Sequence, residues 1–401
     1  MTEEAPPEPR HDRPLIVLLA AITAVGPVAM NIFLPALPDL QAEFGTSLAA
    51  TNLTVSFALL AFAAGILVHG PLSDHYGRRP VILAGLAIFA VGNLLCLLAP
   101  SFGTLLAGRV VQALGTSAGV VVARAMLGDL YGRERMARML AYLTMIMVVG
   151  PTLAPMAGGL LTEALGWRSI FVVLLVANLL IIAYVQRSLP ETRHPGLRAG
   201  GAAALARDAL ALVRRRVFVG FALQASTIYA IFLAFISTAP YVMANLGHGP
   251  TAYGVWYLLV AFGYFLGNWL VTHRGARYGL ARLVTVGVRI QLACIAAGAV
   301  LVASGVWHPA AIFVPMGLAG LGQGLAMPGI SASAIALAPR TPGSAASILG
   351  FTHQMAGALA VQSLALLPAA TPVPLYLFSV VVAAVTWLLL LAVPHTERAT
   401  A

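Results

Sequence analysis

The chain has 401 residues, of which 60% are hydrophobic and only 9% charged, and its formal net charge is +10. Soluble domains carry about 25% charged residues, so this composition excludes a water-soluble globular protein. A membrane-spanning helix needs about 20 apolar residues, so the apolar content allows about twelve spans and excludes a large domain outside the membrane. The two cysteines, Cys96 and Cys294, lie in apolar runs, and neither a disulfide framework nor a cysteine metal site is indicated.

Twelve apolar runs follow one another along the chain, and each is expected to form a helix because a backbone in lipid must satisfy its own hydrogen bonds. The runs lie at 15–37, 48–69, 81–98, 102–123, 139–161, 169–185, 217–239, 252–272, 283–303, 309–336, 344–367 and 374–393. The acidic, proline-rich residues 1–14 lack the basic stretch of a cleaved signal, so the first run is expected to be a retained span. The expected fold is an all-α membrane protein with twelve transmembrane helices.

The basic residues, which are all arginines, predict the orientation. With the N-terminus inside, 19 of the 23 fall in cytoplasmic segments, one (Arg168) in an outer loop, and three within or at the ends of spans. This asymmetry predicts that both termini are cytoplasmic.

The longest polar segment divides the chain into a tail (1–14), an N-terminal six-helix bundle (15–186), a cytoplasmic linker (187–216), a C-terminal six-helix bundle (217–394) and a second tail (395–401). Two six-span halves are a common plan in transporters, and Tyr76-Gly77 and Tyr278-Gly279 suggest a faint repeat between them.

A charged loop is expected at 70–80, after the second run, where the sequence reads GPLSDHYGRRP. Gly70 and Gly77 allow a tight turn, and Asp74 can pair with Arg78 or Arg79. Such a cluster could hold two helix ends in one conformation and release them in another. The same charges also fit an ordinary cytoplasmic loop.

The fifth run carries a face of small residues, because Gly150, Ala154 and Gly158 recur every four positions. Another helix can approach such a face closely. Pro151 and Pro155 are expected to bend this helix and free carbonyl groups. A dry, sealed helix pair would suit alternating access, and plain packing without a gating role is the alternative.

Several motifs resemble those of the major facilitator superfamily. They are the 70–80 segment, RVVQALG at 109–115 with Arg124-Ala125 and Asp129-Leu130, and the fifth run at 150–159, which is similar to the antiporter signature of twelve-helix drug exporters. Four further segments, LPALP at 34–38, GWRSIF at 166–171, LPET at 189–192 and FISTAPYV at 235–242, look like the Bcr/CflA (bicyclomycin and chloramphenicol resistance) branch. The match extends from the first span to the eighth.

This resemblance implies a pseudo-symmetric pair of six-helix bundles and a secondary transporter of the bacterial inner membrane. It would export small amphipathic drugs, such as phenicols, by proton antiport, as a monomer in the lipid bilayer. It would bind a small-molecule substrate and protons, and it implies no cofactor, metal, nucleic acid or enzyme activity. The implied gating residues are Gly70, Asp74, Gly77, Arg78, Arg79, Asp129, Gly150, Pro151, Pro155 and Gly158.

Polar and aromatic residues within the spans are the candidate substrate contacts. They are Asn31, Asn52, Arg109, Gln112, Gln224, Tyr229, Phe232, Gln323, Met327 and Gln354, with Ser56 as a further cavity residue. Arg109 stands out because a cation inside a span is costly and usually faces the bundle interior or a water-filled cavity. Snorkelling to the interface or an internal hydrogen-bond anchor are its other interpretations. Arg289 is expected to be structural, and glycines 317, 320, 322 and 324 suggest a hinge in the tenth span.

Proton coupling has an unusual basis in this chain. The family typically has an acid just before the LPALP stretch, but Asn31 stands there, and an amide cannot titrate. His353 is the only titratable side chain deep in the bundle apart from arginine, and proton carriage, substrate contact and a structural role remain open for it. Asp129 is the other candidate.

Because no acid lies well inside a span, neutral or anionic substrates are expected to be preferred over cations. A specific metabolite exporter or a facilitator without proton coupling is the alternative function. A membrane-embedded enzyme is disfavoured by the scattered histidines.

Overall fold

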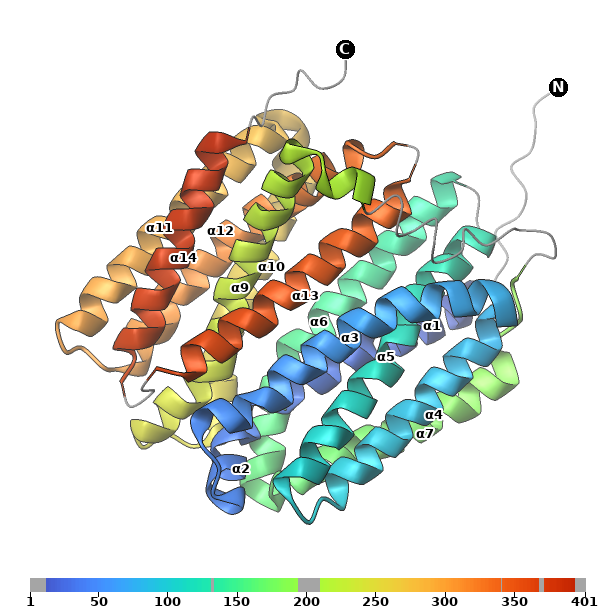
Figure 1. Ribbon diagram of the computed structural model, residues 1–401, viewed down its shortest axis with the longest axis horizontal. Helices are drawn as coiled ribbons and strands as arrows, with labels where there is room; N and C mark the ends of the chain where they lie inside the picture. The colour runs from blue at the N-terminus through green and yellow to red at the C-terminus, as the bar shows by residue number, and fades with distance from the viewer. Residues whose placement is uncertain (1–11, 131–132, 194–209, 340, 368–370, 394–401) are drawn as a thin grey trace.

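The computed structural model describes residues 12–130, 133–193, 210–339, 341–367 and 371–393, and their regular structure is entirely helical (Figure 1). The elements of the first half are α1 (Asp12–Ile32), the 3₁₀ turn η1 (Leu34–Ala36), α2 (Leu37–Phe44), α3 (Leu48–Tyr76), α4 (Arg78–Leu97), α5 (Phe102–Leu130), α6 (Arg133–Leu165) and α7 (Arg168–Ser188). Those of the second half are α9 (Arg216–Asn245), α10 (Pro250–Tyr278), α11 (Leu280–Ala303), α12 (Pro309–Ala336), α13 (Pro342–Ala365) and α14 (Val373–Ala392).

Ten helical segments of the described residues are long and apolar enough to cross a membrane, with 14–44 counted as one segment. The expected all-helical membrane fold is therefore confirmed. Helices α6 and α13, of 33 and 24 residues, occupy the places of the predicted fifth and eleventh spans but are not among the ten. The full set of twelve spans and the side on which the termini lie remain predictions.

The predicted loop at 70–80 is wrong, because α3 continues through Pro71 to Tyr76 and α4 begins at Arg78. The apolar run ends at His69, but a helix that leaves the lipid can continue with polar residues, since its hydrogen bonds remain internal. Only Gly77 separates the two helices, and its φ of +106° favours glycine. Gly279 separates α10 from α11 in the same way with a φ of +76°. These matching turns support the internal repeat that the Tyr-Gly pairs suggested.

Glycines at matching positions in the two halves bring helix backbones together. A Cβ on Gly85 of α4 or Gly115 of α5 would meet the backbone of the other helix, and the same holds for Gly287 of α11 and Gly322 of α12. Gly85 and Gly287 are each the eighth residue of their helices, and Gly115 and Gly322 are each the fourteenth. The pairs α4–α5 and α11–α12 are therefore equivalent parts of a repeated arrangement.

The glycines of α12, which suggested a hinge, lie in one continuous helix, and their surroundings give them a packing role. Gly317, Gly320 and Gly324 lie against the backbone of α10, and Gly322 lies against α11. These glycines serve close packing between helices.

The first-half helices lie at the lower right of Figure 1 and most second-half helices at the upper left. The halves meet through α3–α13 and α6–α10. We call the end at which α1 begins and α14 ends the arginine-rich end, since Arg78, Arg187 and Arg277 lie there. Hydrogen bonds also join the halves toward the opposite end. The Gln362 amide Nε2 donates to the Ala49 carbonyl at 3.3 Å, and the Thr251 N–H donates to the Glu163 carboxylate at 3.3 Å.

The small-residue face of α6 lies against α1. A Cβ on Gly150 would meet the side chain of Val28, and one on Gly158 would meet the backbone carbonyl of Ile32. Another face of α6 touches α10, where Gly254 lies against the backbone at Pro155. Helix α6 is thus packed closely between α1 of its own half and α10 of the other.

Replacing Gly158 with Ala is expected to destabilise the protein, because its new methyl group would meet a backbone carbonyl that cannot rotate away. Overpacking of this kind costs about 1–3 kcal/mol, which a lowered thermal unfolding midpoint of the purified protein would report. The matched control is Gly343→Ala in α13, where nothing lies within 4 Å of the added Cβ. Equal midpoints for the two variants would contradict the close α1–α6 contact.

Candidate functional site

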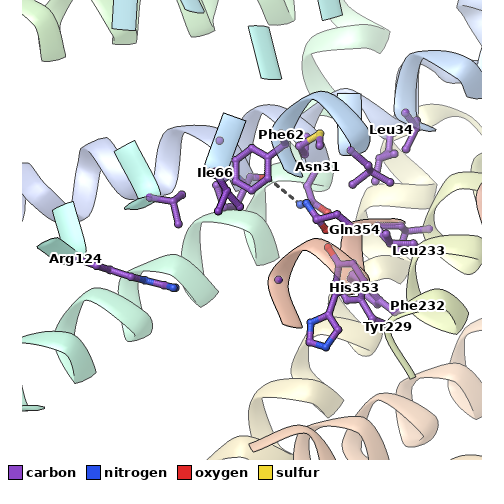
Figure 2. A pocket seen from close by; sticks show the side chains of 18 residues that line it. Asn31, Leu34, Phe62, Ile66, Arg124, Tyr229, Phe232, Leu233, His353 and Gln354 are labelled. Carbon is purple, nitrogen blue, oxygen red and sulfur yellow. Dashed lines mark hydrogen bonds between the residues drawn. The ribbon is translucent and has the colours of Figure 1, made fainter. Parts of the chain in front are cut away.

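A cavity of about 300 Å³ lies between the two halves (Figure 2). Helices α1, α3 and α5 and the turn η1 line it from the first half, and α9 and α13 line it from the second. Its walls are mostly apolar, with side chains such as Met30, Phe62, Ile66, Phe232 and Leu233. A few polar groups interrupt them, and this composition is typical of a site for a small amphipathic molecule.

Asn31 and His353 line the cavity from the two halves, and each has a buried polar atom without a hydrogen-bond partner. The Asn31 amide Nδ2 donates to the Pro27 carbonyl at 2.8 Å, whereas its Oδ1 is buried and has no hydrogen-bond partner. The His353 Nε2 is likewise buried without a partner, and the imidazole ring lies 5.9 Å from the Tyr229 ring. Unsatisfied buried polar atoms cost about 1–3 kcal/mol each, so a bound ligand that paired with them would gain affinity.

Arg124 is the charged group of the cavity. It projects from α5, six residues before that helix ends at the arginine-rich end, and its side chain is exposed (Figure 2). None of the described lining residues is an aspartate or a glutamate. Arg124 is therefore the one permanently charged side chain among the described lining residues. The sequence marked Arg124 as an arginine within or at the end of a span and as part of a resemblance, and its place directly after the apolar run 102–123 was the signal that could have identified it.

Arg109 lies outside this cavity and is buried among first-half side chains. Its Nη1 donates to the Ala29 carbonyl in the last turn of α1 at 3.4 Å, and the guanidinium lies 4.3 Å from the centre of the Phe33 ring. It also donates to Gln112, whose Nε2 donates to Asn93 at 2.9 Å. The carbonyl end of a helix and an aromatic face both stabilise a cation, so this geometry fits the internal anchor that the sequence left open.

The predicted substrate residues fall into two groups, those that line the cavity and those that do not. Those that line the cavity are Asn31, Tyr229, Phe232 and Gln354, together with His353. Those that do not line it are Asn52, Arg109, Gln112, Gln224, Gln323 and Met327. Asn52 is buried and donates to the Leu48 carbonyl of its own helix at 3.2 Å, and Ser56 contacts Gln362 of α13 at 3.4 Å.

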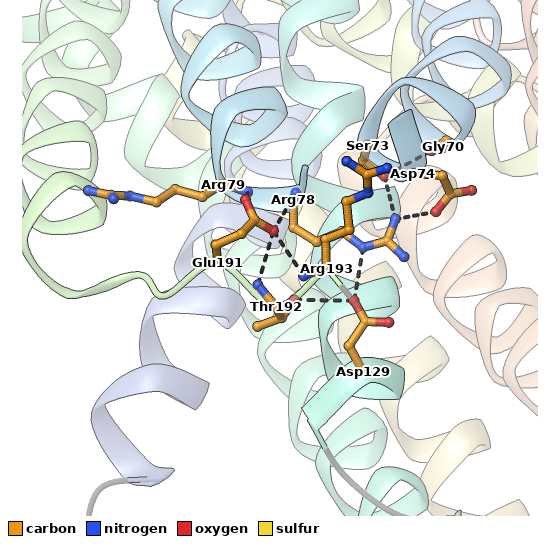
Figure 3. A network of polar contacts seen from close by, with 9 residues as sticks. All are labelled: Gly70, Ser73, Asp74, Arg78, Arg79, Asp129, Glu191, Thr192 and Arg193. Carbon is orange, nitrogen blue, oxygen red and sulfur yellow. Dashed lines mark hydrogen bonds and ion pairs between the residues drawn. The ribbon is translucent and has the colours of Figure 1, made fainter. Parts of the chain in front are cut away.

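Five predicted gating residues gather in a polar network at the arginine-rich end (Figure 3). The buried Arg78 guanidinium bonds Asp129 at 2.9 Å, Asp74 at 2.5 Å and the Ser73 hydroxyl at 2.7 Å. Arg78 is thus the centre of the network and joins the ends of α3, α4 and α5. The Arg79 side chain points away and donates to the Gln186 carbonyl at 2.6 Å. Gly70 lies within α3 and accepts a hydrogen bond from Ser73, while Gly150, Pro151, Pro155 and Gly158 lie along α6.

Glu191, which the sequence marked only as part of a resemblance, caps helix α4. Its carboxylate accepts the backbone N–H groups of Arg78 at 2.9 Å and Arg79 at 3.1 Å, the first two residues of α4. A Cβ on Gly77 would collide with this carboxylate, so glycine is needed there for space as well as for its positive φ. A carboxylate is well suited to a helix start because the free N–H groups carry partial positive charge.

The hydrogen bonds to Glu191 also govern its protonation. Partial burial acts to raise the pKa of the carboxyl, but the N–H groups of Arg193, Arg78, Arg79 and Thr192 outweigh burial and lower the pKa below its ordinary value of 4.5. Because the pKa of Glu191 is lower in the folded state, its hydrogen bonds stabilise the fold fully at pH values above 4.5. This stabilisation is lost as the pH falls from there through the lowered pKa. The cap that Glu191 provides is therefore insensitive to changes in pH near neutrality.

The comparisons with known proteins agree with this architecture. Residues 19–361 match the family profile described as Major Facilitator Superfamily. The chain is 28% identical over 361 residues to "Multidrug resistance protein D" of Escherichia coli, which covers 88% of this chain and 89% of that protein. It is 28% identical to "Bicyclomycin resistance protein homolog" of Haemophilus influenzae, over 86% and 87% of the two chains. It is 29% identical to "Chloramphenicol resistance protein" of Pseudomonas aeruginosa, over 84% and 77%.

A solved structure supports the fold. A bacterial homologue of the human lysosomal transporter Spinster, in an inward-facing and occupied conformation, superposes with a TM-score of 0.75 over 97% of this chain and 98% of that one, at 17% identity. The relatives bear out the resemblance to Bcr/CflA-type drug exporters, which are transporters and not enzymes. The chain belongs to the major facilitator superfamily and is a multi-pass transporter of the bacterial inner membrane.

Proposed function

We propose that this transporter exports small amphipathic drugs, of the phenicol type or other neutral compounds, by alternating access coupled to proton antiport. The observation that carries the proposal is the apolar cavity between the halves, which Asn31 and His353 line and where each has a buried polar atom without a partner. A neutral amphipathic drug would place its apolar surface on the walls and its polar groups on these atoms. The name of the Pseudomonas aeruginosa relative, a chloramphenicol resistance protein, supports the choice of phenicols.

Alternating access would operate between the two ends of the molecule. We take the protein to be a monomer with twelve spans and the arginine-rich end in the cytoplasm, as the positive-inside rule predicts. The halves would then be six-helix bundles, 15–186 and 217–394, that rock about the cavity. The contacts of Gln362 with Ala49 and of Thr251 with Glu163 would close the outer side, and the packing of α6 against α1 and α10 would seal it. Arg124 would face drug that enters from the cytoplasm.

We assign proton carriage to His353 because it is the titratable side chain of the cavity whose ordinary pKa lies near neutrality. Asp129 is a weaker candidate, since its carboxylate already accepts hydrogen bonds from Arg78 at 2.9 Å and from Thr192 at 3.2 Å. Asn31 favours the alternative, a specific metabolite exporter or facilitator without proton coupling, because it places an amide where drug antiporters of this branch carry an acid.

His353→Gln is expected to abolish chloramphenicol transport driven by a pH gradient while preserving counterflow exchange, because an amide can bond substrate but cannot carry a proton. The measurement uses proteoliposomes with an imposed pH gradient. The control is His248→Gln, the same substitution at an exposed position between α9 and α10. Full pH-driven transport by His353→Gln would rule His353 out, and wild-type transport that ignored the gradient would support the uncoupled alternative.

Asp74→Asn is expected to lower turnover about tenfold or more while leaving drug binding intact, because Asp74 contacts Arg78 at the helix ends and does not line the cavity. A hydrogen bond between charged groups contributes about 1.5–3 kcal/mol, enough for such a change in rate. Turnover and equilibrium binding would be compared in the same proteoliposomes, with Asp74→Glu as the charge-conserving control. Wild-type turnover in Asp74→Asn would remove the gating role.

Neutral or anionic amphipathic substrates are expected to be exported in preference to permanent cations, because a buried unpaired charge costs several kcal/mol and the cavity offers Arg124 but no carboxylate. Asn31→Asp and Arg124→Gln should each shift the preference toward cations, and Asn31→Asp should also strengthen the dependence on pH. Resistance profiles for a phenicol and for ethidium would measure the shift. Arg187→Gln, at an exposed position on α7, is the control. Strong wild-type export of ethidium, unchanged in both cavity variants, would show that these residues do not set the preference.

A further inference from the structure

Arg289 is a cation on the outer face of the second half. It is the tenth residue of α11, about 13 Å along the helix from the arginine-rich end. Its side chain is exposed, as are those of Arg282, Val286 and Ala293 on the same helix face, whereas Val288 is buried. This exposed stripe is the face that a membrane-spanning helix presents to lipid. A cation at such a depth is costly unless an anion or a polar group compensates it.

The described residues supply Arg289 with an aromatic ring but no anion. Its guanidinium carbon lies 5.4 Å from the centre of the Trp387 ring on α14, and no ion pair or hydrogen bond to it is found in the described part of the chain. Trp387 lies five residues before α14 ends, so the ring is also near the arginine-rich end. Tryptophan is enriched at the membrane interface, where headgroups meet acyl chains.

Arg289 and Trp387 form the rim of a groove between α11 and α14. The groove has a volume of about 360 Å³, and Leu292 and Ala293 form its apolar wall. It shares no lining residue with the transport cavity. A cation beside an apolar wall on a lipid-facing surface matches a ligand that combines a negative headgroup with a hydrocarbon chain.

We propose that this groove binds an anionic phospholipid from the leaflet at the arginine-rich end, with the lipid phosphate on Arg289 and an acyl chain along Leu292 and Ala293. The phosphate supplies the counter-charge that the groove lacks, and a guanidinium can bond two phosphate oxygens at once. Basic pockets between transmembrane helices are suited to anionic headgroups. A phosphatidylcholine headgroup is a poorer ligand, because its ammonium group offsets the phosphate charge.

The test uses the full chain in nanodiscs of phosphatidylcholine that contain a minor share of brominated phosphatidylglycerol. Bromine quenches tryptophan fluorescence at short range, and subtracting the signal of Trp387→Phe isolates Trp387 from the other four tryptophans. Phosphatidylglycerol should be enriched beside Trp387 about fivefold over its bulk share, the selectivity expected for one arginine near an anionic headgroup. Arg289→Gln should reduce that enrichment to the bulk share, and Arg289→Lys should keep most of it.

The matched control is Arg277→Gln, which removes another exposed arginine whose guanidinium lies 5.6 Å from an aromatic ring, that of Tyr278, outside the groove. This variant should retain the enrichment at Trp387. Equal quenching by brominated phosphatidylglycerol and brominated phosphatidylcholine in the wild type would overturn the proposal without any variant. Undiminished enrichment in Arg289→Gln would overturn the role of Arg289.

Discussion

The close approach of helix backbones at glycines is the interaction on which the rest of this structure depends. Lipid is as apolar as leucine, so helices in a membrane associate through packing and hydrogen bonds instead of hydrophobic burial. Gly85 with Gly115, and Gly287 with Gly322, provide that packing at equivalent positions in the two halves. Helices held this closely move together within each half, so the space that remains for a substrate lies between the two halves. The cavity lined by α1, α3, α5, α9 and α13 is therefore a consequence of how each half packs.

Three arginines of the first half differ in what surrounds their charge. Arg78 is surrounded by Asp74, Asp129 and Ser73. Arg109 lies at the carbonyl end of α1 and over an aromatic ring, an arrangement that compensates a cation without any acid. Arg124 faces the cavity, and its charge is available to a ligand. The order of these residues along the chain does not distinguish the three environments, because each depends on which other helix lies opposite.

The sequence predicted what local spacing determines and missed what distant segments decide. The apolar runs placed the helices, and the four-residue spacing of Gly150, Ala154 and Gly158 identified a packing face, because a helix repeats every 3.6 residues. Asp74 and Arg78 are four residues apart, so their pairing was also within reach. Glu191 was missed because it is 113 residues from Arg78, and a cap supplied from so far away leaves no local pattern. The extent of α3 was missed because hydropathy marks where a helix leaves the lipid, and the hydrogen-bonded helix can continue beyond that point.

The location of the Arg78 network limits how it can act on transport. Its described members come from α3, α4 and α5 of the first half and from the start of the segment that follows α7, and Glu191 ties that segment to the start of α4. None of these described members belongs to a helix of the second half, so the network does not bridge the two halves directly. It can only fix where the ends of those helices lie when the first half moves as a unit. Helix α3 contacts α13 toward its other end, and α5 carries Arg124 five residues before Asp129, so these two helices connect the network to the meeting of the halves and to the charged wall of the cavity. Loosening the network should therefore alter the rate of interconversion between conformations before it alters the affinity of the cavity.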